Sequence, residues 1–288
     1  MRMSLRAAVL GHPIGHSKSP ALHLAAYARL GVEIGYTAID VTEESLPAFM
    51  DSVRAEAGWR GLSVTMPLKK AMVAEVDEVR GVARVLGVIN TVAFEGDGDS
   101  ARRIGYNTDV AGIVNALRNA GAADGTSGVI LGGGGTAAAA VAALQELGAA
   151  SVDLYVRDTA RAAEARAAAA GLGIDISVHT LDGAVEAMAR AGVVISTLPP
   201  RAADGMAAEL EALGRRTDGV LLDVAYDPWP SRIAAAWHAG GGTVVPGLEM
   251  LLYQAVEQVR YFTGLPDAGS AEVIDVMCDA VGAPRRVS

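Results

Sequence analysis

Apolar positions recur along this chain with two periods, one typical of strands and the other typical of helices. Short continuous apolar runs, such as residues 152–156, are typical of strands that are buried on both faces. Between these runs, apolar residues recur every three to four positions, as Val110, Ile113 and Leu117 do. Strands and helices therefore alternate, and this pattern predicts an α/β protein.

Four consecutive glycines mark the most informative segment of the sequence. A predicted strand at residues 128–131 precedes them, a predicted alanine-rich helix at 137–147 follows, and a second predicted strand lies at 152–156. A backbone without side chains lets a pyrophosphate approach the N–H groups at a helix N-terminus, where the helix dipole favours an anion. We therefore interpret this segment as a dinucleotide site, with a glycine-rich connection in some other α/β protein as the alternative. The run reads Gly132, Gly133, Gly134, Gly135 and Thr136.

The same patterning predicts two domains and a C-terminal helical segment. Residues 1–121 alternate strands and helices and include a polar hairpin loop at 95–103. Residues 122–246 continue with apolar strands typical of a doubly wound parallel sheet of the Rossmann type. Residues 247–288 begin with one long helix that has an apolar face, so we expect them to pack back onto the first domain.

Composition narrows the class of protein. With 288 residues, of which 51% are hydrophobic, the chain can build large cores, yet no apolar run approaches the roughly 20 residues of a membrane span. The first ten residues lack a secretory signal pattern, so we expect a cytoplasmic protein without membrane association. The net charge of −9 argues against nucleic acid as a partner. Cys278 is the only cysteine and the histidines lack ligand spacing, so we expect neither a disulfide nor a metal.

Lysine is rare in this chain. Of 24 Lys and Arg residues, only Lys18, Lys69 and Lys70 are lysine, and lysine can give up a proton whereas arginine is effectively always charged. Lys69 follows a predicted strand and Asp109 begins a predicted helix, and both such positions face the ligand crevice of an open α/β sheet. The pair could act as proton donor and acceptor for a carbonyl–alcohol interconversion. The alternative for Asp109 is an acid that stabilises a helix N-terminus.

Polar residues near the same predicted strand ends suit a small hydroxylated acid. Ser17 and Ser19 precede a helix, and two hydroxyls at a helix N-terminus can hold a carboxylate. We expect Ser19 to be the N-cap, with Pro20 as the first helical residue, which leaves Ser17 without a structural role. Further neutral donors and acceptors are Thr65, Asn90 and Gln254, each of which is individually more often structural.

Together these motifs resemble the shikimate dehydrogenase family over nearly the whole chain. In the family's order and spacing lie Ser17-Lys18-Ser19-Pro20, Val64-Thr65-Met66-Pro67-Leu68-Lys69, Ile89-Asn90-Thr91, Asn107-Thr108-Asp109, the glycine run, Asp223-Val224-Ala225-Tyr226 and Gly247-Leu248-Glu249-Met250-Leu251-Leu252-Tyr253-Gln254-Ala255. The chain departs from the family pattern at Ser63, where asparagine is usual, and at Ser196-Thr197-Leu198, where Asn-Ala-Thr is common.

The resemblance implies an oxidoreductase that reversibly reduces 3-dehydroshikimate to shikimate with NADPH, a step of chorismate and aromatic amino-acid biosynthesis. It implies Lys69 and Asp109 as the catalytic pair. The substrate carboxylate would be held by Ser17, Ser19 and Tyr226, and the ring hydroxyls by Thr65, Asn90, Asp109 and Gln254. Residues 132–136 would cradle the pyrophosphate, and Gly247 would lie near the nicotinamide. Monomer and homodimer both remain open.

The choice of cofactor depends on three residues after the strand at 152–156. Arg157 and Arg161 match the pair that clamps a ribose 2′-phosphate in NADP-preferring members of the family, whereas Asp158 could accept a hydrogen bond from the free ribose hydroxyl of NAD. Two guanidiniums against one acid favour NADP. The alternatives are an NAD-dependent quinate/shikimate dehydrogenase and, from another class, a non-catalytic nucleotide-sensing module on the same fold.

Overall fold

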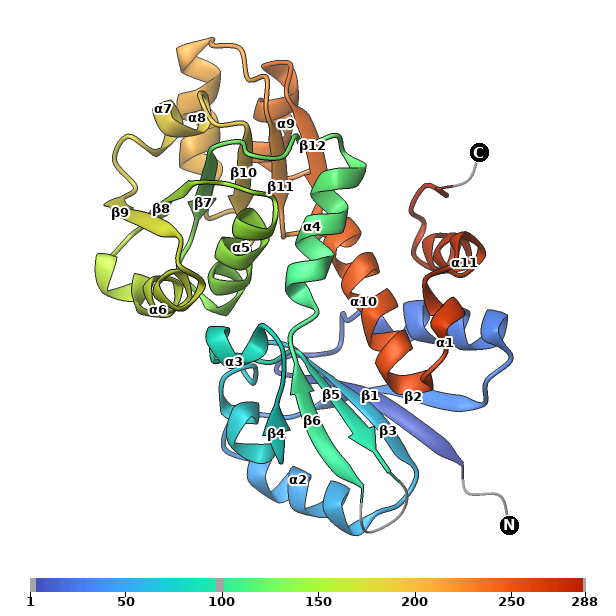
Figure 1. Cartoon of the computed structure of the whole chain (residues 1–288). Helices are drawn as coiled ribbons and strands as arrows, with labels where there is room; N and C mark the ends of the chain where they lie inside the picture. Colours follow the sequence, from blue (N-terminus) through green and yellow to red (C-terminus); the bar gives the residue numbers. More distant parts are fainter. Residues whose placement is uncertain (1–3, 97–100, 287–288) are drawn as a thin grey trace. The chain divides into compact units, whose positions relative to one another are not determined.

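The computed structural model describes residues 4–96 and 101–286 (Figure 1). By internal contacts the chain divides into two compact units, one formed by Met1–Thr108 with Gln254–Ser288 and the other by Asp109–Tyr253. The first boundary lies before α4 (Asp109–Asn119), because this helix packs on α5 (Gly135–Glu146) and β11 (Val220–Asp223). The predicted first domain, residues 1–121, included that helix. The C-terminal segment that belongs to the first unit starts at Gln254, whereas the predicted segment started at residue 247.

The first unit contains a mixed sheet with the strand order β2-β1-β3-β5-β6-β4. Strands β2, β1 and β3 run parallel to one another. Strand β5 is antiparallel to β3 and to β6, and β4 is parallel to β6. The strands are β1 (Leu5–Gly11), β2 (Ile34–Asp40), β3 (Trp59–Val64), β4 (Glu78–Val79), β5 (Thr91–Glu95) and β6 (Arg102–Tyr106). The hairpin loop predicted at 95–103 therefore contains the start of β6, and residues 97–100 lie outside the described part.

Helices cover both faces of this sheet (Figure 1). On one face, α2 (Leu46–Ala55) buries Leu46, Met50 and Val53 against the sheet, since its apolar residues follow the helical period. On the other face lie α1 (Ser19–Leu30), the end of α10 (Gly247–Thr263) and α11 (Ala271–Val281), which packs on α1. Shorter helical segments are η1 (Ala71–Glu75), α3 (Ala83–Leu86) and η4 (Pro266–Gly269).

A close approach joins the end of α10 to the sheet. A Cβ at Gly61 in β3 would lie 2.0 Å from the ring of Phe262, which is fully buried. Only glycine lets this ring lie directly on the strand. Gly61 therefore allows α10 to pack on β3, although the two segments are about two hundred positions apart in sequence.

The start of α1 differs from the sequence prediction. Ser19 is the first helical residue, no side chain caps the helix, and the preceding Lys18 has helical torsion angles. Instead, the Ser17 hydroxyl accepts a hydrogen bond from the Ser19 N–H at 3.3 Å. The prediction that Ser19 is the cap was therefore wrong, because a capping residue precedes the helix with extended torsion angles, whereas Ser19 is already helical. The helix ends at Gly31, which is left-handed with φ of 68°.

The second unit contains a fully parallel sheet with the strand order β12-β11-β10-β7-β8-β9. This order confirms the predicted doubly wound sheet of the Rossmann type. The strands are β7 (Gly128–Leu131), β8 (Ser151–Val156), β9 (Asp175–Thr180), β10 (Val193–Ser196), β11 and β12 (Thr243–Pro246). The central strands β7, β10 and β11 are buried throughout, which explains their continuous apolar sequences.

The helices of this unit form two layers (Figure 1). One layer contains α4, α5 and α6 (Ala163–Leu172), which follows η3 (Thr159–Ala162). The other contains α7 (Ala184–Met188), α8 (Asp204–Leu213) and α9 (Arg232–Ala239) over an apolar core that includes the fully buried Trp237. The alanine-rich helix α5 is buried along most of its length because small side chains let it pack closely between neighbours.

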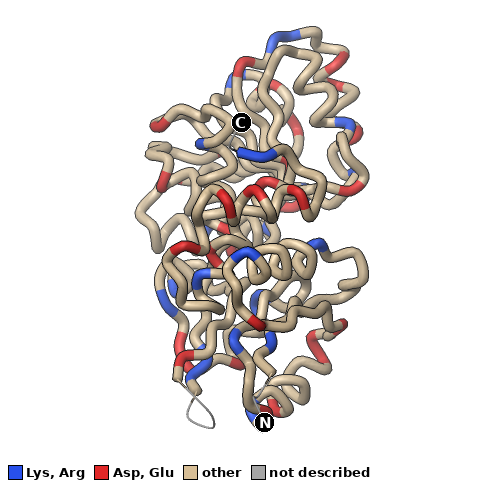
Figure 2. Tube along the Cα trace, turned by 90° about the vertical axis from the view of Figure 1, so that its right-hand side faces the viewer, with Lys and Arg blue, Asp and Glu red and all other residues tan. Residues whose placement is uncertain are grey.

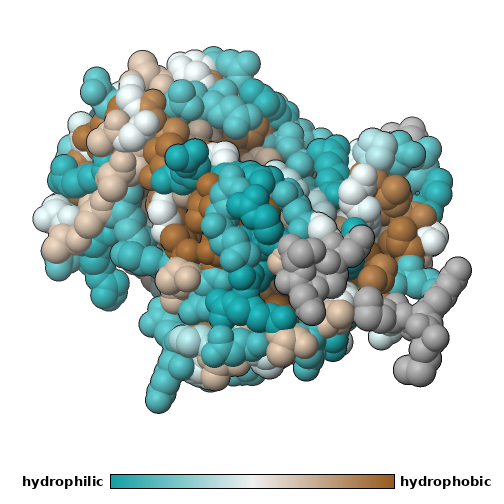
Figure 3. Space-filling view, turned by 60° about the horizontal axis from the view of Figure 1, so that its bottom comes forward, coloured by the Kyte–Doolittle hydropathy of each residue, from teal (hydrophilic) through white to brown (hydrophobic). Residues whose placement is uncertain are grey.

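The surface of the described residues carries both charge signs and separated apolar positions. Figure 2 shows basic and acidic residues interspersed along the trace, and the face in Figure 3 is mostly hydrophilic with scattered hydrophobic patches. Among the described residues, no helix has both the length and the apolar character that crossing a bilayer requires.

Candidate functional site

The loops after β1 and β3 meet at one edge of the first sheet. The Thr65 N–H donates to the Leu10 carbonyl at 2.9 Å, and the His12 N–H donates to the Met66 carbonyl at 3.0 Å. A Cβ at Gly11 would lie 2.5 Å from the Thr65 side chain, so glycine is what allows this approach. Because these strands are parallel, their carboxyl ends present both loops to the same side of the unit, where ligands of α/β folds bind.

Asn90 connects several candidate residues of this edge. Its side chain is 2% exposed, its Oδ1 accepts from the Thr108 N–H at 2.7 Å, and its Nδ2 donates to the Thr108 hydroxyl at 3.0 Å. The Nδ2 also lies 3.4 Å from Oε1 of the buried Gln254. The structure thus brings together Asn90 and Gln254, two candidates that are 164 positions apart.

The backbone of Lys69 is hydrogen-bonded next to this cluster. Its carbonyl accepts from the Ile89 N–H at 3.0 Å, one residue before Asn90. The side chain is half-buried, and Leu68 before it is fully buried, so the packing of Leu68 anchors the position of the lysine. Asp109 directly follows Thr108, is 4% exposed and opens α4. Its location in the first helical turn fits both the catalytic and the helix-stabilising interpretation.

A buried polar chain that the sequence did not single out extends from Asn90. Gln258 is 1% exposed, and its Nε2 donates to the Asn90 carbonyl at 3.2 Å and to the Thr91 hydroxyl at 3.1 Å. Its Oε1 accepts from the Ser63 hydroxyl at 2.7 Å, and Ser63 in turn accepts from the Tyr36 hydroxyl at 2.6 Å. The available signal was the spacing of Gln254 and Gln258, which puts both amides on one face of a helix.

The three candidates for the substrate carboxylate come from both units. Ser17 is half-buried in the loop before α1, and Ser19 is 5% exposed. Tyr226 belongs to the second unit and is half-buried in the loop after β11. Burial, and secondarily the charge of Asp227, raises the pKa of the Tyr226 phenol, so it is a hydrogen-bond donor at neutral pH.

The glycine run forms an open turn at the N-terminus of α5. Gly132 has φ of 99°, and a Cβ there would lie 2.7 Å from the Thr197 hydroxyl. A Cβ at Gly133 would lie 2.6 Å from the Arg161 carbonyl. Gly134, by contrast, is exposed, with nothing within 4 Å of such a Cβ, and it precedes Gly135 and Thr136 without any side-chain cap. The uncapped start of α5 is therefore open at Gly134, as a phosphate cradle requires.

Three charged residues follow β8: two arginines without an ion-pair partner in the described part of the chain and one aspartate whose carboxylate is hydrogen-bonded. Arg157 and Arg161 are exposed, and neither forms an ion pair with any described residue. The Asp158 carboxylate accepts a hydrogen bond from the Ala160 N–H at 2.9 Å and thereby caps η3. The helical segment after β8 therefore begins as a short 3-10 turn. Asp158 already has a structural role, whereas the guanidiniums are available to an anion.

Gly247 has a packing role in this structure. A Cβ at this residue would lie 2.1 Å from the Val224 carbonyl oxygen, so glycine is needed where α10 begins beside the end of β11. This contact lies at the carboxyl edge of the parallel sheet, the edge at which such folds hold their ligands. Among the described residues, no group of three or more His, Cys, Asp or Glu could hold a metal ion.

Two family profiles and many relatives match the chain. The "Shikimate dehydrogenase substrate binding domain" matches residues 9–92, and the "Shikimate 5'-dehydrogenase C-terminal domain" matches residues 247–266. A "Shikimate dehydrogenase (NADP(+))" of Rubrobacter xylanophilus is 38% identical over 267 residues, covering 91% of this chain and 92% of the relative.

Solved structures agree with this similarity. The crystal structure of Mycobacterium tuberculosis shikimate dehydrogenase aligns with a TM-score of 0.83 and 39% identity, covering 96% of this chain and 99% of that one. The Thermus thermophilus enzyme in complex with NADP(H) and shikimate aligns with a TM-score of 0.76 and 31% identity, covering 96% and 99%. The similarity thus extends over both compact units.

Proposed function

This chain belongs to the shikimate dehydrogenase family, and from that premise we propose that it reversibly reduces 3-dehydroshikimate to shikimate with NADPH. The observation that supports this proposal most strongly is the identity of 38% over 267 residues, which cover 91% of the chain. In this role the protein is an oxidoreductase of aromatic amino-acid and chorismate biosynthesis.

The proposed cofactor is NADP, which would supply the hydride. The fit rests on the open turn at Gly134, the uncapped start of α5 and the free guanidiniums of Arg157 and Arg161. The turn offers backbone N–H groups to a pyrophosphate, and the arginines offer bidentate donors to a 2′-phosphate. Because Asp158 is engaged in capping, its carboxylate is less available to the free ribose hydroxyl that distinguishes NAD.

In the proposed mechanism Lys69 handles the proton. Its ammonium donates a proton to the carbonyl oxygen during reduction, and its amine accepts the hydroxyl proton in the reverse direction. Asp109 orients that ammonium and the substrate hydroxyl. Asn90 is held by Thr108 and Gln254, so its amide is fixed in place before a ligand arrives. Such fixed polar groups lower the reorganisation needed in the transition state.

The remaining proposed contacts position the substrate. Ser17, Ser19 and Tyr226 hold the ring carboxylate through neutral donors. Thr65 and Gln254 join Asn90 and Asp109 in binding the ring hydroxyls. Gly247 lies on the nicotinamide side of the cofactor. This set offers hydroxyl and amide donors, which suits a polar substrate with several hydroxyl groups.

The test is the absorbance of reduced nicotinamide after purified protein is mixed with shikimate and either NADP or NAD. We expect turnover with NADP to exceed turnover with NAD, and shikimate to be oxidised in preference to quinate. A clear preference for NAD together with quinate oxidation would support the alternative of a quinate/shikimate dehydrogenase. Binding of nicotinamide without turnover of either alcohol would support a nucleotide-sensing module.

The proposal also includes a cytoplasmic location, with either a monomer or a homodimer as the working form. Fractionation of producing cells tests the location, because the shikimate-oxidising activity should remain with the cytosolic fraction. Light scattering on the purified protein distinguishes a monomer of 29.5 kDa from a dimer of twice that mass.

A further inference from the structure

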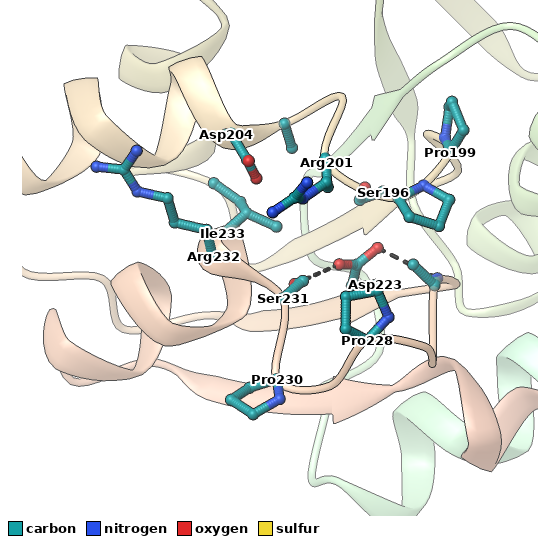
Figure 4. A pocket seen from close by; sticks show the side chains of 13 residues that line it. Ser196, Pro199, Arg201, Asp204, Asp223, Pro228, Pro230, Ser231, Arg232 and Ile233 are labelled. Carbon is teal, nitrogen blue, oxygen red and sulfur yellow. Dashed lines mark hydrogen bonds between the residues drawn. The ribbon is translucent and has the colours of Figure 1, made fainter.

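A pocket of about 260 Å³ lies in the second unit at the carboxyl ends of β10 and β11 (Figure 4). It is bordered by the loop that leads into α8 and the loop that leads into α9. Its volume is below the roughly 300–1,000 Å³ of sites for drug-sized ligands, so its occupant would be small. None of the residues proposed above for catalysis or for cofactor and substrate binding lines this pocket.

A buried hydroxyl without a partner lines the pocket. Ser196 is 1% exposed, and its Oγ forms no hydrogen bond in the described structure. The other pocket serine, Ser231, is fully engaged, because its hydroxyl donates to Asp223 at 2.6 Å and accepts from the Ala234 N–H at 3.2 Å. An unpaired buried hydroxyl is unfavourable, and a ligand that hydrogen-bonds to Ser196 would remove that penalty.

Asp223 supplies a carboxylate with remaining capacity. It is 3% exposed and accepts from Ser231 and from the Ala225 N–H at 3.3 Å. A carboxylate offers about four acceptor sites, so further donors can bind there. Burial raises the pKa of this carboxyl, against the opposing effect of its hydrogen bonds.

A strained arginine supplies the opposite charge. Arg201 has φ of 68°, the one positive φ outside glycine among the described residues. Figure 4 shows its side chain extending toward Asp204 and Ile233, above Asp223 in this view, and it forms no ion pair with any residue that the structure describes. The second pocket arginine, Arg232, extends away and bonds to Glu211 at 3.2 Å. Strained backbone of this kind occurs at ligand clamps.

We propose that this pocket binds a small zwitterion of the α-amino acid class, with its carboxylate on Arg201 and its ammonium on Asp223 and Ser196. A simple anion would meet the carboxylates of Asp204 and Asp223, and a simple cation would meet Arg201. A molecule with one charge of each sign matches both. A guanidinium binds a carboxylate with two parallel hydrogen bonds, and an ammonium offers donors for the carboxylate and the free hydroxyl. The pocket prolines, among them Pro199, Pro228 and Pro230, leave an apolar rim for a side chain.

The test is isothermal titration of the cofactor-free protein with individual L-amino acids up to roughly 10 mM, tenfold above a millimolar dissociation constant. For each amino acid that binds, the matching amine and the matching carboxylic acid serve as probes that lack one charge. We expect the amino acid to bind at least tenfold more tightly than either probe. No binding by any amino acid, or equal binding by a single-charge probe, would overturn the proposal.

Variants locate the binding. Arg201→Gly removes the guanidinium at a backbone conformation that glycine adopts readily, so the fold should persist. It should weaken amino-acid binding at least tenfold, and Ser196→Ala should weaken it severalfold, whereas the exposed Arg215→Ala should leave it unchanged. Unchanged affinity in Arg201→Gly and Ser196→Ala would place the ligand elsewhere and refute the site. Since the readout is binding without turnover, the outcome is independent of the proposed dehydrogenase activity.

Discussion

Asn90 shows both how far single residues could be interpreted from the sequence and where that interpretation ended. The sequence offered it as a neutral donor and acceptor that is individually more often structural, and the structure places it between Thr108 and Gln254. The partners of Gln258 could not be predicted, because they depend on pairing between β3 and β5 and on the packing of α10 against both. Ser63, a departure from the family pattern, gained its explanation only from these contacts.

The role proposed for Lys69 predicts a large difference between two neighbouring lysines. Lys69→Arg keeps a positive charge but removes a group that can give up its proton, so kcat for shikimate oxidation should fall by about 10²-fold or more. The matched control is Lys70→Arg, whose side chain is exposed and which should keep near-normal turnover. Similar kcat values for Lys69→Arg and the unchanged protein would remove Lys69 from the proton step.

The buried chain through Gln258 predicts a stability effect. Gln258→Met removes an amide that satisfies Ser63, Thr91 and the Asn90 carbonyl, so the free energy of unfolding should fall by about 1–3 kcal/mol. Gln145→Met, at an exposed position of α5, is the matched control and should change it by less than about 0.5 kcal/mol. Urea unfolding of both variants measures the difference, and equal losses would show that the chain adds no stability.

Elements with a strong apolar period were predicted closely, and elements without one were missed. The strand at 128–131 has the predicted bounds, and the parallel sheet follows from the apolar runs. In contrast, the start of β6 was taken for part of a loop because it carries two arginines and its stability comes from pairing with β5. The start of α1 was mistaken because the residue at which a helix begins depends on backbone torsion angles, which the presence of a serine does not determine.

The glycine turn before α5 predicts opposite outcomes for two substitutions. Gly132→Ala combines a left-handed φ of 99° with a contact of 2.7 Å to Thr197, so it should lower the free energy of unfolding by about 1–3 kcal/mol. Gly134→Ala meets open space, so the protein should keep its stability but bind NADP at least tenfold more weakly, because the new methyl group occupies space proposed for the pyrophosphate.

Thermal unfolding and titration calorimetry separate these outcomes. A Gly134→Ala protein that binds NADP as tightly as the unchanged protein would show that the phosphate does not approach this glycine. If Gly134→Ala lost both NADP binding and thermal stability, Gly134 would have a structural role like that of Gly132. A lowered thermal midpoint of Gly134→Ala would reveal this.

For the whole molecule, the buried His23 predicts how stability depends on pH. Burial lowers the pKa of His23 to about 4, against 6.5 for an exposed histidine, with a weaker opposing effect from the Ser19 carbonyl. Its ring stacks on Tyr36 at 4.0 Å, and its Nε2 has no partner. Between these two pH values the unfolded chain binds a proton that the folded chain does not. Stability should therefore fall as pH drops from about 6.5 to about 4, by about 3 kcal/mol from this residue.

Urea unfolding at several pH values checks this expectation. His23→Phe keeps a ring against Tyr36 and should flatten the slope of stability against pH in that window, whereas the exposed His238→Gln should preserve the slope. An unaltered slope in His23→Phe would assign the pH dependence to other groups.

The helix α10 has a consequence for how the chain melts. Its backbone hydrogen-bond ladder runs without interruption from Gly247 to Thr263, while the boundary between the compact units falls inside it, between Tyr253 and Gln254. If one unit unfolds, its part of α10 loses helical structure, and the hydrogen bonds of the adjoining turns in the other unit's part are lost as well. Heat capacity recorded on warming should accordingly show one merged peak for both units, and severing the helix at that midpoint with a proline should split the peak in two.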